Sequence, residues 1–332
     1  MLPLLLAPPP ALAQTRVLFV GNSHTFVNDL PGLFAGLAQA AGQPVTADES
    51  AFGGYTWEQH AANGATLAKI AKGGWDHVFL QEHSLYPSID VLWETSSVPA
   101  ARQLDSLIAA SASGTGFFMT WGWELGGSHC VGDDCSPDFP DYFAMQHAVT
   151  EAYVALSTEL DAFLVPAGSV WARALAVDPA SPLWAADHYH PSLEGSYLTA
   201  CVFFARVFDE SPEGLDFYGG IDPARALFYQ GIAAEVLADA PEFPPKEASR
   251  LVNYPNPFNP RTRFEFVLDE GADAVLTILD AGGRLVDRYD LGRLPAGRHR
   301  CDWDAGGSPS GVYVASLSAG GCRERRKIAL LR

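Results

Sequence analysis

Three residues in two distant parts of the chain have the types needed for acyl transfer. Ser23 follows the apolar run VLFV and lies in the polar segment GNSHT. Asp187 and His190 lie three residues apart in the segment WAADHYHPS. A serine hydroxyl becomes a nucleophile when a histidine takes its proton and a carboxylate orients that histidine. The spacing lets Asp187 bind one ring nitrogen of His190 while the other nitrogen faces Ser23, which predicts a catalytic triad.

Donors for the negative charge that forms on attack follow two other apolar runs. Gly53 and Gly54, in AFGGYTW, leave the backbone N–H open to a ligand. Gln81, in FLQEHS, adds a side-chain amide. The two glycines and the amide of Gln81 are therefore candidate donors for this charge.

Each of these residues also has a purely structural interpretation. Ser23 would cap a helix, the glycine pair would form a simple turn, and Gln81 would cap the end of a strand. His188 competes with His190 as the base and is interpreted as a solvent-exposed loop residue. The pairing of His190 with Asp187 and the order of the segments along the chain favour the catalytic interpretation.

Aromatic residues beside these segments are candidates for a substrate pocket. Tyr55 follows the glycine pair, and Trp121 and Trp123 follow a further apolar run. Aromatic faces suit sugar rings, and packing in the core or at the rim is the alternative. Structural roles are assigned to the neighbouring residues His24, Glu82 and His83.

The chain that positions these residues alternates short apolar runs with helical periods from residue 16 to about 240. Strands are predicted at 16–21, 44–51, 75–82, 115–123 and 162–169, and helices at 30–42, 56–73, 97–113, 139–160 and 191–208. Such alternation predicts a parallel sheet covered by helices on both faces. Sites in these sheets lie at the carboxyl ends of the strands, where Ser23, Gln81 and Trp121 fall.

The chain changes character near residue 250. Residues 1–250 hold nine Lys and Arg and 29 Asp and Glu, whereas residues 251–332 hold 12 and 10. A Pro-rich polar linker is expected at 241–250, between a first domain at 14–240 and a second at 251–332. The second domain has six short alternating segments separated by Gly- and Asp-rich turns, which predicts a small all-β sandwich.

The N-terminal residues and the overall charge limit the location and the partners. Residues 1–13 are apolar and end in Ala-Leu-Ala, which fits a signal peptide without its charged start. No later run is apolar and long enough for a transmembrane segment. The formal net charge of -18 argues against nucleic acid as a partner. We therefore expect an exported protein.

Five cysteines are present, and export makes disulfides plausible. Cys130 and Cys135 bracket a short loop that a disulfide would close, and Cys301 and Cys322 are a second candidate pair. Cys201 lies in an apolar run and is expected to be a core thiol. The alternative for the segment SHCVGDDC is a metal site, but it lacks the second ligand pair of a structural zinc site.

Taken together, the segments resemble those of the SGNH/GDSL hydrolase family over roughly residues 16–210. That family has a serine block, a glycine block, an amide block and an Asp-x-x-His block, and here these are GNSHT, FGGYT, LQEHS and DHYH. Two positions depart from the usual pattern. Asn22 replaces an aspartate, and Gln81 replaces an asparagine.

The resemblance implies a three-layer α/β/α sandwich with a parallel, flavodoxin-like sheet. It also implies that Ser23 attacks an ester carbonyl, that His190 passes the proton to the leaving alcohol, and that Asp187 orients the imidazolium. The oxyanion donors that it implies are the N–H groups of Ser23 and Gly54 and the amide of Gln81. It implies neither a metal nor an organic cofactor. The expected substrates are small-molecule or glycan esters, with acetyl esters of carbohydrates as the leading class.

The second domain resembles the C-terminal sorting domain of the type IX secretion system, which has an Ig-like pattern. The resemblance rests on NYPNPFNPRTRFEF, ILDAGGRLVDRYDLG, AGRHRCDWD and SGVYVASLSAG and covers nearly all of 251–332. It implies export through the periplasm, contact with the secretion machinery, and a secreted or cell-surface location. A passive, glycan-binding accessory domain is the alternative.

Two other functions are kept as alternatives to a secreted serine esterase. One is a non-catalytic cell-surface glycan-binding or adhesion protein with an esterase-like domain. The other is a metal-dependent hydrolase that uses the Cys/His/Asp loop. All three triad positions are filled, which favours the esterase.

Overall fold

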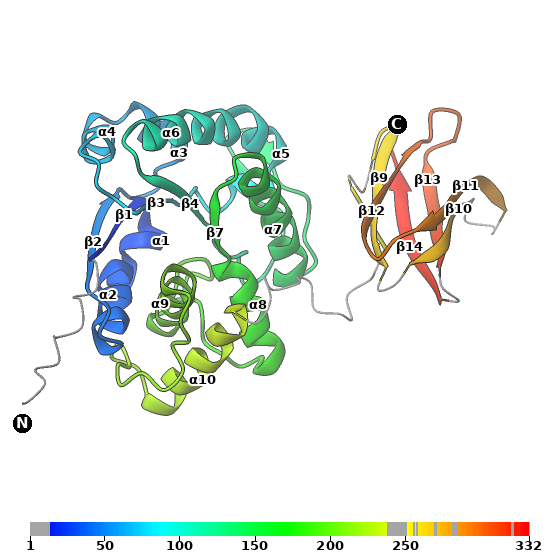
Figure 1. The fold of residues 1–332 in the computed structure, drawn as a ribbon. Coiled ribbons are helices and arrows are strands. Elements are labelled where there is room, and N and C mark those ends of the chain that lie inside the picture. Colours follow the sequence, from blue (N-terminus) through cyan, green and yellow to red (C-terminus); the bar gives the residue numbers. More distant parts are fainter. Residues whose placement is uncertain are drawn as a thin grey trace, which may run out of the picture. The chain divides into compact units, whose positions relative to one another are not determined.

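The computed structural model describes residues 14–237, 251–254, 256, 258–268, 271–280, 284–319 and 322–331. The expected signal peptide at 1–13 and linker at 241–250 lie outside these residues. The chain divides into two compact units, Met1–Phe243 and Pro244–Arg332. Each unit is described by itself (Figure 1).

The N-terminal domain alternates strands and helices. Its elements are β1 (Thr15–Gly21), α1 (Ser23–Phe26), η1 (Val27–Asp29), α2 (Leu30–Ala40), β2 (Val45–Ala51), α3 (Trp57–Ala62), α4 (Gly64–Ala71), β3 (His77–Leu80), η2 (Tyr86–Ser88), α5 (Asp90–Leu92), η3 (Trp93–Ser97), α6 (Val98–Ala110), β4 (Gly114–Phe118), β5 (Cys130–Val131), β6 (Asp134–Cys135), α7 (Tyr142–Glu159), β7 (Phe163–Val165), α8 (Ala167–Val177), α9 (Leu193–Phe208), α10 (Pro223–Ala234) and η4 (Glu235–Leu237). Elements η1, η2 and η4 are 3-10 helices, and η3 is a π-helix.

The central sheet has the predicted parallel arrangement. Its strand order is β2-β1-β3-β4-β7, and every neighbouring pair is parallel. This is the flavodoxin-like order, in which the chain turns back beside its first strand. Parallel strands place their carboxyl ends at one edge, so the segments after β1, β2 and β3 lie together there. The sequence-based fold prediction is confirmed.

Two helical layers cover the sheet because alternate side chains of a strand point to opposite faces. Val17 and Phe19 of β1 pack with α2, α8, α9 and α10 on one face. Leu18 and Val20 pack with α3, α4, α6 and α7 on the other. All four side chains are buried, and each such side chain stabilises the fold by about 1.5–3 kcal/mol.

Three parts of the prediction need correction. The single helix predicted at 56–73 is broken at Asn63, whose side chain accepts hydrogen bonds from the N–H groups of Ala65 and Thr66 and so starts a new helix. The strand predicted at 162–169 ends at Val165, and helix α8, which was not predicted, begins at Ala167. Helix α10 was not predicted either, although it begins with a recognisable start signal, an Asp222 cap and Pro223 in its first turn.

The C-terminal domain consists of two antiparallel sheets. Its strands are β8 (Leu251–Tyr254), β9 (Arg261–Leu268), β10 (Ala272–Asp280), β11 (Leu285–Leu294), β12 (Gly297–Asp304), β13 (Gly311–Ala319) and β14 (Cys322–Leu330). One sheet has the order β11-β10-β13-β14 and the other β12-β9-β8. Their inward-facing apolar residues form one core, as a β-sandwich requires.

Cys301 is not part of a disulfide. It is a buried free thiol on β12, in a different sheet from the β14 strand that begins at Cys322. The suggested pairing of Cys301 with Cys322 is therefore wrong. Cys201 is the buried thiol that the sequence indicates.

Among the described residues, no helix combines the length and the apolar character needed to cross a membrane.

Candidate active site

The structure brings Ser23, Asp187 and His190 into one hydrogen-bonded line. His190 Nε2 lies 2.8 Å from Ser23 Oγ, and His190 Nδ1 lies 2.7 Å from Asp187 Oδ2. A carboxylate only accepts hydrogen bonds, so Nδ1 carries the ring proton and donates it to Asp187. The Nε2 lone pair then faces the Ser23 hydroxyl. This arrangement is able to remove the hydroxyl proton during attack on a carbonyl.

Ser23 is positioned by the turn between β1 and α1. The strand ends at Gly21, and Asn22 caps the helix by accepting a hydrogen bond from the N–H of His24. Ser23 is the first helical residue, and its backbone N–H has no hydrogen-bond partner among the described residues. The side-chain amide of Asn22 donates to the Tyr55 carbonyl at 2.9 Å, which joins this turn to the glycine segment.

The glycine segment forms a tight turn directly after β2. The Phe52 N–H donates to the Gly21 carbonyl, and the Tyr55 N–H donates back to the Phe52 carbonyl. Gly54 has a φ of 71°, a conformation that favours glycine, and is exposed. Its N–H has no partner within the described part of the chain. Both predicted backbone donors therefore lie in adjoining turns with their N–H groups unused.

Gln81 is placed differently from the prediction. Its side-chain oxygen accepts hydrogen bonds from the Asn22 N–H at 2.8 Å and the Thr25 hydroxyl at 3.1 Å, and its NH₂ group donates to the Glu82 carbonyl. Gln81 is buried, with 1% exposure. Its amide is thus engaged in holding the Ser23 turn, and in this arrangement it does not serve as a free oxyanion donor.

The Asp187–His190 segment is a compact turn between α8 and α9. The Ala185 N–H donates to the His190 carbonyl, which closes the turn. Asp187 Oδ1 accepts hydrogen bonds from the backbone N–H groups of Tyr189 and His190, while Oδ2 binds the imidazole. Partial burial raises the pKa of Asp187, but these hydrogen bonds outweigh it and lower the pKa overall. Asp187 is therefore an anion wherever an imidazolium would form.

His24 connects the nucleophile helix to this turn, a contact that the sequence analysis missed. Its Nε2 lies 3.1 Å from the Tyr189 carbonyl, and its ring packs against those of Trp121 and His190. Burial, reinforced by the nearby His190, lowers the pKa of His24 to about 3. His24 is therefore neutral and donates its Nε2–H to Tyr189.

Two of the three proposed pocket aromatics fit the rim of the site, and Trp121 does not. Trp121 is 1% exposed and stacks on Trp171 at a centroid distance of 3.9 Å, so it belongs to the core. Trp123 is half-buried and stacks on Tyr189, which in turn packs on His190. Tyr55 is half-buried in the glycine turn.

The segment after Trp123 contains a small β5–β6 hairpin. Cys130 and Cys135 are paired across it in a disulfide. Both thiols are thus consumed, which leaves neither available as a metal ligand for the alternative metal-dependent reaction.

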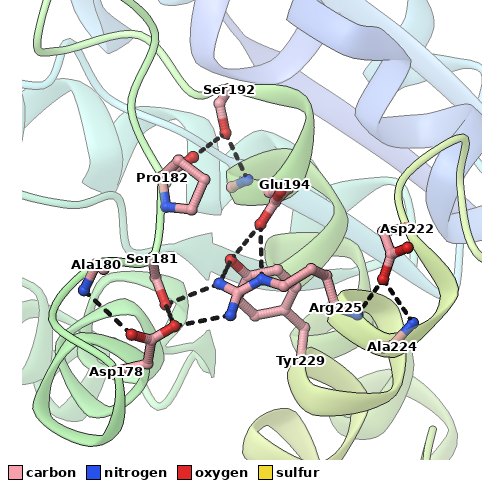
Figure 2. A network of polar contacts seen from close by, with 11 residues as sticks. Asp178, Ala180, Ser181, Pro182, Ser192, Glu194, Asp222, Ala224, Arg225 and Tyr229 are labelled. Carbon is pink, nitrogen blue, oxygen red and sulfur yellow. Dashed lines mark hydrogen bonds and ion pairs between the residues drawn. The ribbon is translucent and has the colours of Figure 1, made fainter.

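A network around Arg225 fastens both ends of the segment that carries Asp187 and His190 (Figure 2). The Arg225 guanidinium donates to Asp178 at 2.7 Å and Ser181 at 3.0 Å on one side, and to Glu194 at 3.2 Å on the other. The Tyr229 hydroxyl also donates to Glu194, at 2.6 Å. Arg225 and Tyr229 come from α10, so this helix fixes the base of the segment.

Replacing Arg225 with methionine is expected to destabilise the N-terminal domain by about 2–3 kcal/mol, because partly buried carboxylates would lose their partner. That corresponds to a fall in Tm of about 5–10 °C for a domain of this size. Arg225→Lys keeps the charge but not the planar fork of donors, so its Tm should lie between those of the wild type and the methionine variant. Scanning calorimetry measures the effect, and an unchanged Tm in the methionine variant would show that the network contributes nothing.

A pocket of about 720 Å³ lies beside the segment that follows His190. The Asn28 side chain lines it and donates to the Pro191 carbonyl at 3.1 Å, which links the pocket wall to the triad segment. Asp29 and Asp216 supply further oxygen atoms, and Leu193 with Phe217 supplies an apolar wall. Acceptor groups beside an apolar face suit a neutral polyhydroxylated ligand.

Comparison with known proteins agrees with this architecture. Residues 258–321 match the FlgD Ig-like domain family. The chain is similar to the structure of a DUF4886 family protein from Bacteroides uniformis, with 18% identity, 69% of this chain and 96% of that chain covered, and a TM-score of 0.57. The N-terminal domain thus shares the fold of the Bacteroides uniformis protein, and the C-terminal domain matches the FlgD Ig-like family. No curated protein sequence matches it significantly.

Two further structures resemble the N-terminal domain. One is a candidate SGNH hydrolase from Slackia heliotrinireducens, at 27% identity, with 59% of this chain and 100% of that chain covered and a TM-score of 0.48. The other is an acetyl xylan esterase from Geobacillus stearothermophilus, at 14% identity, with 61% and 96% covered and a TM-score of 0.41.

Proposed function

We propose that the protein is a secreted serine esterase that hydrolyses carboxylic esters through Ser23, His190 and Asp187. The proposal rests on one observation above all, the unbroken hydrogen-bonded line from the Ser23 hydroxyl through His190 to Asp187. In this mechanism Ser23 Oγ attacks the carbonyl carbon and His190 takes its proton. His190 then returns the proton to the leaving alcohol, and water releases the acyl group by the same steps in reverse.

The oxyanion is held by the N–H groups of Ser23 and Gly54, both of which lack another partner among the described residues. Each such donor contributes about 3–4 kcal/mol to transition-state stabilisation. Gln81 acts by holding the Ser23 turn. It could donate to the oxyanion only after its amide leaves the Glu82 carbonyl.

We propose acetyl esters of carbohydrates as the substrate class, with the alcohol part in the pocket lined by Asn28, Asp29 and Asp216. The oxygen atoms of that pocket accept hydrogen bonds from sugar hydroxyls, and its carboxylates disfavour an anionic alcohol. The acetyl xylan esterase named above supports this class only by its resemblance in fold. The C-terminal domain supports a further proposal, that the protein leaves the cell through type IX secretion.

Purified full-length protein should hydrolyse p-nitrophenyl acetate, and Ser23→Ala should lower kcat by about 10⁶-fold because it removes the hydroxyl that forms the acyl-enzyme. Initial rates with the nitrophenyl ester and with acetylated xylose oligomers measure both parts of the proposal. Equal activity in the Ser23→Ala variant would refute the serine mechanism. Activity on the nitrophenyl ester with none on any acetylated sugar would refute the substrate class alone.

A further inference from the structure

Glu82 is a buried carboxyl group that the mechanism above does not use. It follows Gln81 at the end of β3 and is 0% exposed. Its Oε1 accepts a hydrogen bond from the Trp57 N–H at 3.1 Å and another from its neighbour His83 at 2.6 Å. Trp57 is the first residue of α3, directly after the glycine turn.

The glycine turn is therefore tied down on three sides. Its entry is bound to the Gly21 carbonyl, Tyr55 at its exit is bound to the Asn22 amide, and α3 is bound to Glu82. The first two hydrogen bonds join the glycine turn to the Ser23 turn. The third joins it to the end of β3, where Gln81 also binds the Ser23 turn. The exposed Gly54 lies between these fixed points.

We propose that Glu82 is a positioning residue that holds the glycine turn at 52–55 against the end of β3, so that the Gly54 N–H stays in place to bind the oxyanion. This inference rests on the proposed esterase function and adds a residue to it.

Burial, rather than its hydrogen bonds, favours the neutral form of Glu82. Oε1 accepts both short hydrogen bonds and Oε2 accepts a longer one, at 3.3 Å from the Trp57 nitrogen, and these N–H donors favour the carboxylate. Burial raises the pKa of Glu82 to about 8. The titratable groups that interact with it are Glu58 on α3, Tyr86 on η2 and Tyr153 on α7.

Two substitutions separate the positioning role from a general effect on folding. Glutamine reproduces the shape and acceptor of the neutral acid, so Glu82→Gln should keep kcat within about twofold at pH 7. Leucine has no acceptor, so Glu82→Leu should lower kcat by about 10²-fold, as when one oxyanion donor is lost, with KM changed less than about threefold.

Ile70→Ala serves as the matched control. Ile70 is buried in the same helical layer and does not contact Glu82, so its truncation weakens the fold without releasing the turn. Its kcat should stay close to that of the wild type at temperatures below unfolding. A folded Glu82→Leu protein with wild-type kcat would overturn the inference, and so would an equal loss in the leucine and glutamine variants.

Hydrogen exchange tests the inference without relying on activity. Amides in residues 52–58 should exchange faster in Glu82→Leu than in the wild type and in Glu82→Gln, while those of β1 should not change. If the wild-type protein hydrolyses no ester, the proposed function fails, but the hydrogen-exchange rates still test the positioning role of Glu82. Unchanged exchange rates at 52–58 in the leucine variant would refute that role.

Discussion

Replacing Asp187 with asparagine is expected to lower kcat for ester hydrolysis by about 10³–10⁴-fold, with little change in KM. The Asn side chain can turn its NH₂ group toward Nδ1 of His190, which would then accept that hydrogen bond. The ring proton would move to Nε2 and face the Ser23 hydroxyl, so the imidazole could no longer take the serine proton. Steady-state rates with p-nitrophenyl acetate measure the effect.

The chain contains a matched control for this experiment in the neighbouring pair His188 and Glu124. Their side chains lie 2.6 Å apart, about as close as the 2.7 Å between Asp187 and His190, but the His188 side chain is 52% exposed and that of His190 is 22% exposed. No contact between His188 and Ser23 is present in the described structure, so His188→Ala should leave kcat within about threefold of the wild type. A loss as large as that of Asp187→Asn would mean that His188 is the base and that the assignment of His190 is wrong.

The stability of the N-terminal domain is expected to fall between about pH 4.5 and pH 8 because of Glu82. Burial raises its pKa from 4.5 to about 8, so in this range the folded protein holds a proton that the unfolded chain releases. The stabilisation is complete below the unfolded pKa and is lost as the pH rises through the folded pKa. The shift corresponds to a loss on the order of 5 kcal/mol.

The measurement compares the wild type with Glu82→Gln, which cannot titrate at this position. Urea unfolding at several pH values gives the free energy of unfolding of each protein, and seven of the eight tryptophans report on this domain. As the pH rises, the free energy of unfolding of Glu82→Gln should increase relative to that of the wild type. If the two free energies of unfolding change equally with pH, the pKa of Glu82 is not raised in the folded protein.

The sequence alone was enough to predict those residues of the site that lie within short, recognisable segments of the chain. Ser23 follows a strongly apolar strand, and Asp187 and His190 lie within one turn, so the residue types and short spacing identified the group that the fold brings together. The parallel sheet was predictable for the same reason, since apolar strands alternate with amphipathic helices. The periodicity of apolar residues can predict a helix or a strand, but it cannot predict which residues the end of that helix or strand contacts.

The errors fall where partners come from distant segments. Gln81 looks like a free amide at a strand end, but its oxygen binds the Ser23 turn and its NH₂ group donates to the Glu82 carbonyl. Trp121 follows a strand and yet stacks on a helix that lies 50 residues further along the chain. Glu82 and His24 were assigned only general structural roles because the sequence does not show their burial. That burial shifts the pKa of both residues.

Helix α10 sets the smallest fragment that holds the proposed triad in place. A protein cut after Phe208 would retain Ser23, Asp187 and His190. It would lack Arg225 and the buried face of α10, and so both the contacts that hold the triad segment and part of one core (Figure 2). Chimeras and truncated expression clones of the N-terminal domain should therefore extend at least to Leu237, well beyond the last recognisable motif.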